Sequence, residues 1–140
     1  MNESNEVGSY LILATIDASS NYSVTAIPGW YNILHRPLVI EMDSAEKIYD
    51  GHPLVRNTYD IDGLVTGHTL YSIDISGSQL DVGESANIAT NVVVHDGDGH
   101  NVTSNYEATY LDGGLKVTHA LVTVKANDMG KVYGTQDPVL

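Results

Sequence analysis

Hydrophobic and polar residues alternate along several short segments of this chain, which is the pattern of half-buried β-strands. The longest such segments are Ser9–Ile16, His68–Ile75 and Ala86–His95, all rich in β-branched and aromatic residues. Shorter apolar runs at Leu38–Ile40 and Val122–Val124 predict two more strands. The pattern therefore favours a chain built from strands.

Strict alternation over residues 68–75 predicts two faces of one strand. One face would hold Leu70, Ser72 and Asp74, and the other Tyr71, Ile73 and Ile75. Turn-forming clusters separate the predicted strands, at residues 17–21, 28–29, 50–51, 62–63, 76–78, 96–99 and 112–114. The only helical signal is a single turn over Asp43–Lys47, where Asp43 and Glu46 fit a capping pattern.

Many short strands with turn signals at this spacing are typical of a β-sandwich or barrel. We therefore expect an all-β fold, with an immunoglobulin-like β-sandwich as the specific prediction. A β-grasp-like or other small all-β module is the alternative.

The chain also repeats itself. Ser20-Asn21-Tyr22 returns as Ser104-Asn105-Tyr106, and Lys47-Ile48-Tyr49 returns as Lys131-Val132-Tyr133, both shifted by 84 positions. Residues 20–49 align with 104–133 without a gap, and eight of these 30 pairs are identical. Ordinary residue frequencies would give about two. A fixed period of this size indicates an array of modules.

The phase of the repeat predicts the module boundaries. Residues 37–120 would be one complete module, 1–36 the closing strands of a preceding one and 121–140 the opening strands of the next. Val7-Gly8 matches Val82-Gly83 at a shift of 75, so the complete module would carry nine extra residues. We expect the chain to be a piece of a longer tandem array, with neighbouring modules of the same chain as partners.

Charge and composition exclude several classes of partner and site. Eighteen acidic residues against six basic ones give a net charge of −12, which repels nucleic-acid phosphates and anionic lipid. No apolar stretch is long enough to span a membrane. The sequence contains no cysteine, so disulfides and thiolate metal sites are excluded. We predict no nucleic-acid partner and no membrane insertion.

One segment resembles the start of a calcium loop. Asp96-Gly97-Asp98-Gly99-His100-Asn101 alternates carboxylates with glycine, but the closing glutamate of an EF-hand is missing. A hairpin turn needs the same Asp-Gly pairs. We interpret the segment as a turn, with a calcium site at Asp96 and Asp98 as the alternative. His95 and His100 flank it without a third ligand, so we predict no metal and no cofactor.

Catalytic motifs are missing. The chain has no nucleophile elbow, phosphate loop or His-Glu-x-x-His pattern. Acidic pairs such as Asp60 and Asp62 leave a small hydrolase as a remote alternative, but in turns such residues usually bind backbone amides. The prediction is a protein that is not an enzyme. Trp30, Tyr31 and Tyr110 are candidate ligand-binding residues if they are exposed.

Taken in order, several strings resemble a known family of repeat modules. They are Lys47-Ile-Tyr-Asp-Gly51, Gly63-Leu-Val-Thr-Gly-His-Thr-Leu70, Gly77-Ser-Gln-Leu-Asp-Val-Gly83, Asn101-Val-Thr-Ser-Asn-Tyr106 and Gly113-Gly-Leu-Lys-Val-Thr118. This order resembles the YDG and mostly-beta glycine-rich (MBG) modules of large bacterial surface proteins. Residues 121–138 look like the opening of the next module.

The resemblance implies a secreted or cell-wall-attached, adhesin-like protein whose modules form an extracellular stalk or spacer without catalytic residues. The alternative is a module that binds carbohydrate or a host protein. The two partial modules at the ends would also be complementary, so we expect that copies of the chain can associate by strand addition.

Overall fold

The computed structural model describes residues 6–16 and 21–139. This part of the chain is all-β, with several sheets and no α-helix. The strands are β1 (Gly8–Ile12), β2 (Gly29–Ile33), β3 (Arg36–Met42), β4 (Ala45–Ile48), β5 (Tyr59–Asp62), β6 (Thr69–Ser76), β7 (Gly83–His95), β8 (Tyr106–Leu111) and β9 (Gly113–Thr118), and a short 3-10 turn, η1, spans Thr103–Asn105. The turn predicted at 17–21 lies almost entirely outside the described residues.

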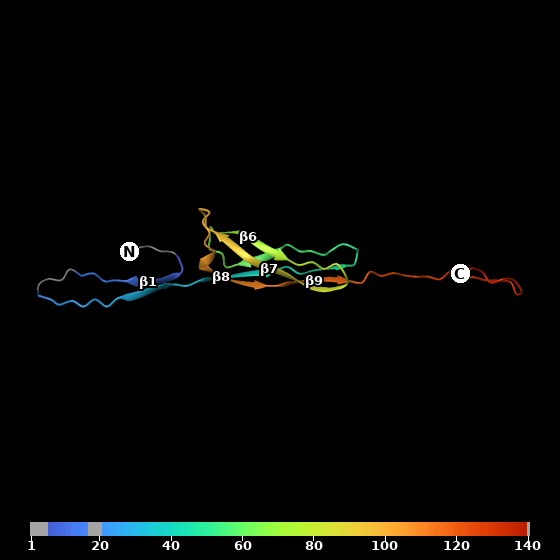
Figure 1. Ribbon diagram of the computed structural model, residues 1–140, viewed down its shortest axis with the longest axis horizontal. Helices are drawn as coiled ribbons and strands as arrows, with labels where there is room; N and C mark the ends of the chain where they lie inside the picture. Colours follow the sequence, from blue (N-terminus) through green and yellow to red (C-terminus); the bar gives the residue numbers. More distant parts are fainter. Residues whose placement is uncertain (1–5, 17–20, 140) are drawn as a thin grey trace.

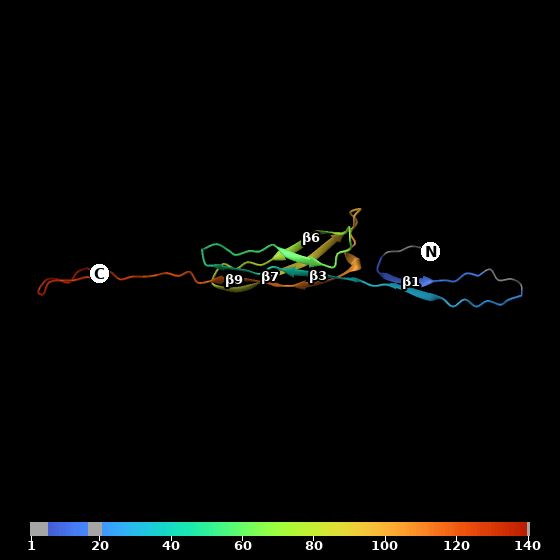
Figure 2. The same cartoon turned by 180° about the vertical axis from the view of Figure 1, so that it is seen from behind.

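The molecule is elongated and has three parts. A two-stranded ribbon, β1–β2, lies at one end, and residues 119–139 form an extended arm at the other (Figures 1 and 2). Between them lies a body of two sheets, one with strand order β5-β3-β8 and one with order β4-β9-β7-β6. No helical segment in the described residues has the length and hydrophobicity of a membrane span.

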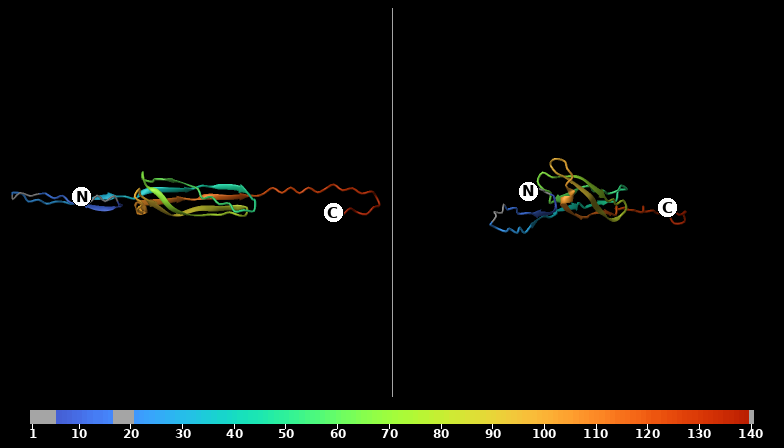
Figure 3. Two further views of the ribbon diagram at one scale, coloured as in Figure 1. Left: turned by 90° about the horizontal axis from the view of Figure 1, so that it is seen from above. Right: turned by 60° about the vertical axis from the view of Figure 1, so that its left-hand side comes forward.

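Two stretches of chain pass from one sheet of the body to the other. β3 continues into β4 after Asp43-Ser44, and β8 continues into β9 after Asp112. They run side by side, since β3 pairs with β8 and β4 with β9, both in parallel (Figure 3). The β3-β4 stretch and the β8-β9 stretch therefore pass from one sheet to the other together.

The crossing brings two backbones unusually close. A Cβ added at Gly113 would overlap the carbonyl oxygen of Asp43 and lie 2.7 Å from that of Met42, so only glycine fits there. Asn87, fully buried, donates from Nδ2 to the same Asp43 oxygen at 3.0 Å. Arg56 and Thr58 hold the Asp43 carboxylate, and its pKa is lowered by the hydrogen bonds from Thr58 and then Arg56. The crossing is thus fixed by sterics and by hydrogen bonds.

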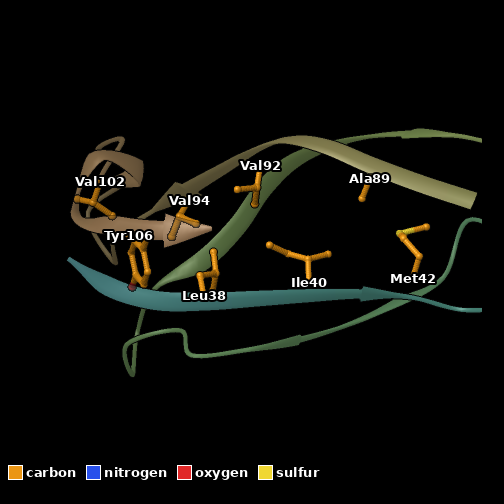
Figure 4. Packing of buried hydrophobic residues seen from close by; sticks show 8 residues of the cluster. All are labelled: Leu38, Ile40, Met42, Ala89, Val92, Val94, Val102 and Tyr106. Carbon is orange, nitrogen blue, oxygen red and sulfur yellow. The ribbon is translucent and has the colours of Figure 1, made fainter. Parts of the chain in front are cut away.

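The core lies between the two sheets (Figure 4). Alternate residues of β3 point inward and meet residues of β7 and the segment around η1. The buried cluster consists of Leu38, Ile40, Met42, Ala89, Val92, Val94, Val102 and Tyr106. This burial of apolar surface is the main favourable term for folding the body.

The strict alternation predicted for residues 68–75 is wrong at two residues, Leu70 and Tyr71, and Tyr71 is 69% exposed instead of sharing a face with Ile73 and Ile75. Leu70, Ile73 and Ile75 all pack on the core, although alternation places Leu70 on the other face. The pairing of β6 with β7 shifts register between Leu70 and Ser72 and again between Ser72 and Asp74. These shifts turn the side chains before and after them toward different faces than strict alternation predicts. Asn91, opposite the second shift, has a positive φ of 53°. The pairing irregularity explains the departure.

Three further predictions of local structure need correction. The single helical turn that Asp43–Lys47 could form is absent: Asp43 and Ser44 link β3 to β4, and β4 begins at Ala45, because pairing with β9 outweighs the capping pattern. The strand expected at Val122–Val124 is not formed, since no neighbouring strand pairs with it in the described residues. The strand expected over Ser9–Ile16 is confirmed only to Ile12, where its pairing with β2 ends.

Gly113→Ala tests the crossing. We expect it to destabilise the body by about 3 kcal/mol, because the added methyl group overlaps backbone atoms that cannot rotate away. Gly114→Ala is the matched control, since its nearest atom is the Ser44 Oγ at 3.8 Å. Urea unfolding of both variants measures the difference. Equal stability of the two would contradict the steric argument.

Candidate functional site

The ribbon has the same pairing register as part of the body. In the body, β7 and β9 pair as Gly83↔Val117 through Asn87↔Gly113. In the ribbon, β1 and β2 pair as Gly8↔Ile33 through Ile12↔Gly29. The sequence shifts of 75 and 84 convert each ribbon pair into the corresponding body pair. The ribbon is therefore a structural copy of the closing strands of the body.

A junction connects the ribbon to the body, and Asn105 is its centre. The Asn105 Oδ1 accepts a hydrogen bond from the Val7 backbone N–H at 2.8 Å, and its Nδ2 donates to the Glu6 carboxylate at 2.7 Å. Only Leu34 and His35 separate β2 from β3. The two-residue link between β2 and β3 and the two hydrogen bonds of the Asn105 side chain therefore fix the ribbon against the body.

Tyr106 supports the junction from inside the body. Its ring is buried, and its hydroxyl accepts from the Val65 N–H at 3.1 Å and lies 2.7 Å from the His68 Nδ1. A small hollow of about 350 Å³ lies between ribbon and body. It is lined by Val7, Ile33, Leu34, Arg36, Val65, His68, Asn105 and Tyr106.

The repeated Ser-Asn-Tyr motif thereby acquires a structural role that the sequence did not reveal. In the body, its Asn105 binds the ribbon and its Tyr106 fills the core. In the ribbon copy, the matching Tyr22 is 76% exposed, and Ser20 lies outside the described residues. The signal that the sequence offered is the repetition of this motif at the 84-residue shift.

A second, larger hollow of about 630 Å³ lies over the sheet of β4, β9 and β7. Its lining includes Glu46, Lys116 and Glu84, which the strand register places in one row, and Lys116 lies 3.5 Å from Glu84. Ala86, with its small side chain, and Gly114, which has none, also line the hollow. The hollow is shallow and its charged groups are exposed, so it offers a contact surface rather than an enclosed chemical site.

The three aromatic candidates do not form one site. Trp30 and Tyr31 are 66% and 56% exposed, but as neighbours on β2 they face opposite sides of the ribbon. Tyr110 is half-buried against the core, and its hydroxyl accepts from the Val92 N–H at 3.0 Å. Tyr110 is therefore less exposed than the prediction assumed, because its ring packs on the core and its hydroxyl binds the irregular part of β7.

The acidic turn brings together three of the potential ligands that the sequence contains. Asp96, Asp98 and His100 bring ligand atoms within 4.8 Å of one another. However, the Asp96 Oδ1 already accepts from the backbone N–H groups of Asp98 and His100, at 3.0 and 2.8 Å. The bond from the His100 N–H is the largest cause of the lowered Asp96 pKa. These bonds close the turn that the Asp-Gly pattern predicts.

In comparisons with protein-family models, with curated proteins and with solved structures, no match to this chain was found.

The junction can be tested at one amide. Asn105→Ala removes the acceptor of the Val7 N–H, so we expect hydrogen exchange of that amide to accelerate about tenfold. Tyr110→Phe is the control, because it should accelerate exchange at Val92 and leave Val7 unchanged. Unchanged Val7 exchange in Asn105→Ala would show that the amide contact does not hold the ribbon.

The acidic turn makes stability dependent on pH. The folded-state pKa of Asp96 lies below its ordinary value of 3.8, so its contribution is present above that value and is lost as pH falls through the folded pKa. Asp96→Asn should therefore be less stable than wild type at neutral pH, and the gap should close in acid. Chemical unfolding at a series of pH values measures it, with Asp98→Asn as control.

Millimolar calcium should leave the melting temperature unchanged. Two carboxylates and one imidazole fall short of the six to eight oxygen ligands that calcium takes, and Asp96 is already engaged by the turn. Thermal unfolding with calcium and with chelator measures this, and a rise of several degrees would contradict it.

Proposed function

We propose that the chain consists of tandem all-β modules of the YDG or MBG type, which act as a non-catalytic stalk or spacer at the surface of a bacterial cell. The observation that carries this proposal is the ribbon, whose register copies that of β7 and β9 pair for pair. A sequence repeat that is also a repeat of strand pairing supports modules in series.

The body supports an immunoglobulin-like sandwich as the module fold. Two sheets face each other across one core, and two stretches of chain change sheet together. The β-grasp alternative would require a helix packed on a sheet, and the described residues form none. We therefore assign residues 37–120 to one module, 1–36 to the end of another and 121–140 to the start of a third.

The geometry of the body suits a spacer. Because β3-β4 and β8-β9 are parallel, the chain enters the body beside the start of β8 and leaves it at the end of β9. Entry and exit therefore lie at opposite ends, where the figures place the ribbon and the arm (Figure 1). Modules connected in this way extend the structure, and the net charge of −12 keeps such an array well solvated.

One observation favours carbohydrate or host-protein binding as a second function. Trp30 pairs across the ribbon with Leu11, and both side chains are substantially exposed, at 66% and 48%. An exposed tryptophan is a frequent anchor for binding. Glycan-array binding that is lost in Trp30→Ala, and kept in Tyr71→Ala as a control for an exposed ring, would support this function over the spacer.

The proposed location can be tested with an antibody raised against residues 36–118. We expect it to label intact cells of the source organism, because the stalk would lie outside the membrane. An antibody to a cytosolic protein, which should label only lysed cells, is the control. If the antibody against residues 36–118 labels only lysed cells, as the control antibody does, the surface location is contradicted.

A further inference from the structure

The ribbon at one end of the molecule and the arm at the other both expose many apolar side chains. The exposed apolar residues of the ribbon and its loop are Leu11, Ile12, Leu13, Ile16, Tyr22, Val24, Ile27, Trp30, Tyr31 and Leu34, and those of the arm are Leu121, Val122, Val124, Met129, Val132, Tyr133 and Val139. Exposed apolar side chains in such number at both ends indicate an interaction site.

We propose that residues 120–132 of one copy of the chain add to the ribbon of a second copy as two successive parallel strands. The 84-residue shift makes this arm segment the counterpart of β3 and β4. Leu38 and Ile40 of β3 are fully buried, whereas their counterparts Val122 and Val124 are 79% and 89% exposed. The arm thus carries the inward-facing residues of β3 without a sheet to cover.

The ribbon lacks the strand that the arm would supply. Its Tyr31 corresponds to Leu115 of β9, which is fully buried, but Tyr31 itself is 56% exposed. In the body, β9 has β7 on one side and β4 on the other, whereas among the described residues β2 pairs with β1 alone. Residues 22–27, the counterpart of β8, form no strand, since no counterpart of β3 lies beside them in the described residues.

Gly29 provides an independent indication of the missing strand. It corresponds to Gly113, where the crossing β3-β4 backbone leaves no space for a Cβ. At Gly29, the nearest described atom to an added Cβ is the Ile12 Cβ at 3.9 Å, so the described part of one chain leaves space for a side chain there. A glycine at this position is required once a strand equivalent to β3-β4 crosses there.

The body fixes the register of the proposed pairing. The pair Val39↔Thr109 places Thr123 of the arm opposite Thr25, and Lys47↔Val117 places Lys131 opposite Ile33. Arm and ribbon lie at opposite ends of the molecule in all views (Figures 1 to 3), so one copy supplies the arm and another the ribbon. This head-to-tail contact is heterologous and builds chains of copies.

Sedimentation of the full chain over a range of concentrations tests the association. We expect the average mass to rise at least about twofold with concentration, as mass action requires. Val124→Asp should abolish the rise, because it places a charge at the counterpart of buried Ile40. Val132→Asp is the matched control and should leave it intact, since its counterpart Ile48 is 64% exposed in the body.

Gly29→Ala adds a second variant that leaves the free chain unchanged. Its melting temperature should equal that of wild type, while association should be lost because the methyl group occupies the path of the incoming strand. Wild type that stays monomeric, or association that survives both Val124→Asp and Gly29→Ala, would overturn the proposal.

Cysteine pairing tests the register, because the chain has no cysteine of its own. Thr25→Cys and Thr123→Cys proteins, mixed under oxidising conditions, should form a mixed disulfide about tenfold faster than Thr25→Cys mixed with Asn127→Cys, because residue 127 lies four positions further along the arm. Equal rates would overturn the register.

The inference rests on the sequence repeat and not on the cellular location. Its failure would therefore leave the proposed stalk untouched, and failure of surface labelling would leave the inference untouched.

Discussion

The parallel crossing of two stretches of chain between the sheets is the constraint on which the body depends. At this point the carbonyl groups of Met42 and Asp43 occupy the space that a side chain at position 113 would need. The buried amide of Asn87 donates to the Asp43 carbonyl, so the polar backbone is satisfied where neither sheet ladder can reach it. Because both stretches cross together in the same direction, the chain enters the body at one end and leaves it at the opposite end.

Tyrosine hydroxyl groups satisfy the backbone where the strands become irregular. The chain has nine tyrosines and no phenylalanine. Tyr110 accepts from the Val92 N–H beside the irregular pairing of β6 and β7, and Tyr106 accepts from the Val65 N–H in the loop before β6. Each ring contributes apolar contact area while its hydroxyl accepts a hydrogen bond from a backbone amide. Phenylalanine would leave both amides without these acceptors.

The junction shows how a loop motif can fix the ribbon relative to the body. Asn105 uses both ends of its amide, one on the Val7 backbone and one on Glu6, while the next residue, Tyr106, is anchored in the core. The side chain that contacts the ribbon is therefore positioned by a buried neighbour. Packing of Tyr106 in the core therefore helps to set the direction in which the ribbon leaves the body.

The sequence by itself determined the all-β character of the chain and its repeat, because alternating apolar residues, Asp-Gly turns and a constant 84-residue shift are local or linear signals. The turn at Asp96–Gly99 was also predictable from its own residues. The tertiary structure decided that residues 45–48 are a strand, that Leu70 faces the core, that Tyr110 is half-buried and that Asn105 forms the junction. Each of these depends on a partner distant in the sequence. The same dependence explains why Leu38–Ile40 form a strand beside β8 whereas Val122–Val124, with a similar pattern, do not: a strand forms only where another backbone completes its hydrogen bonds.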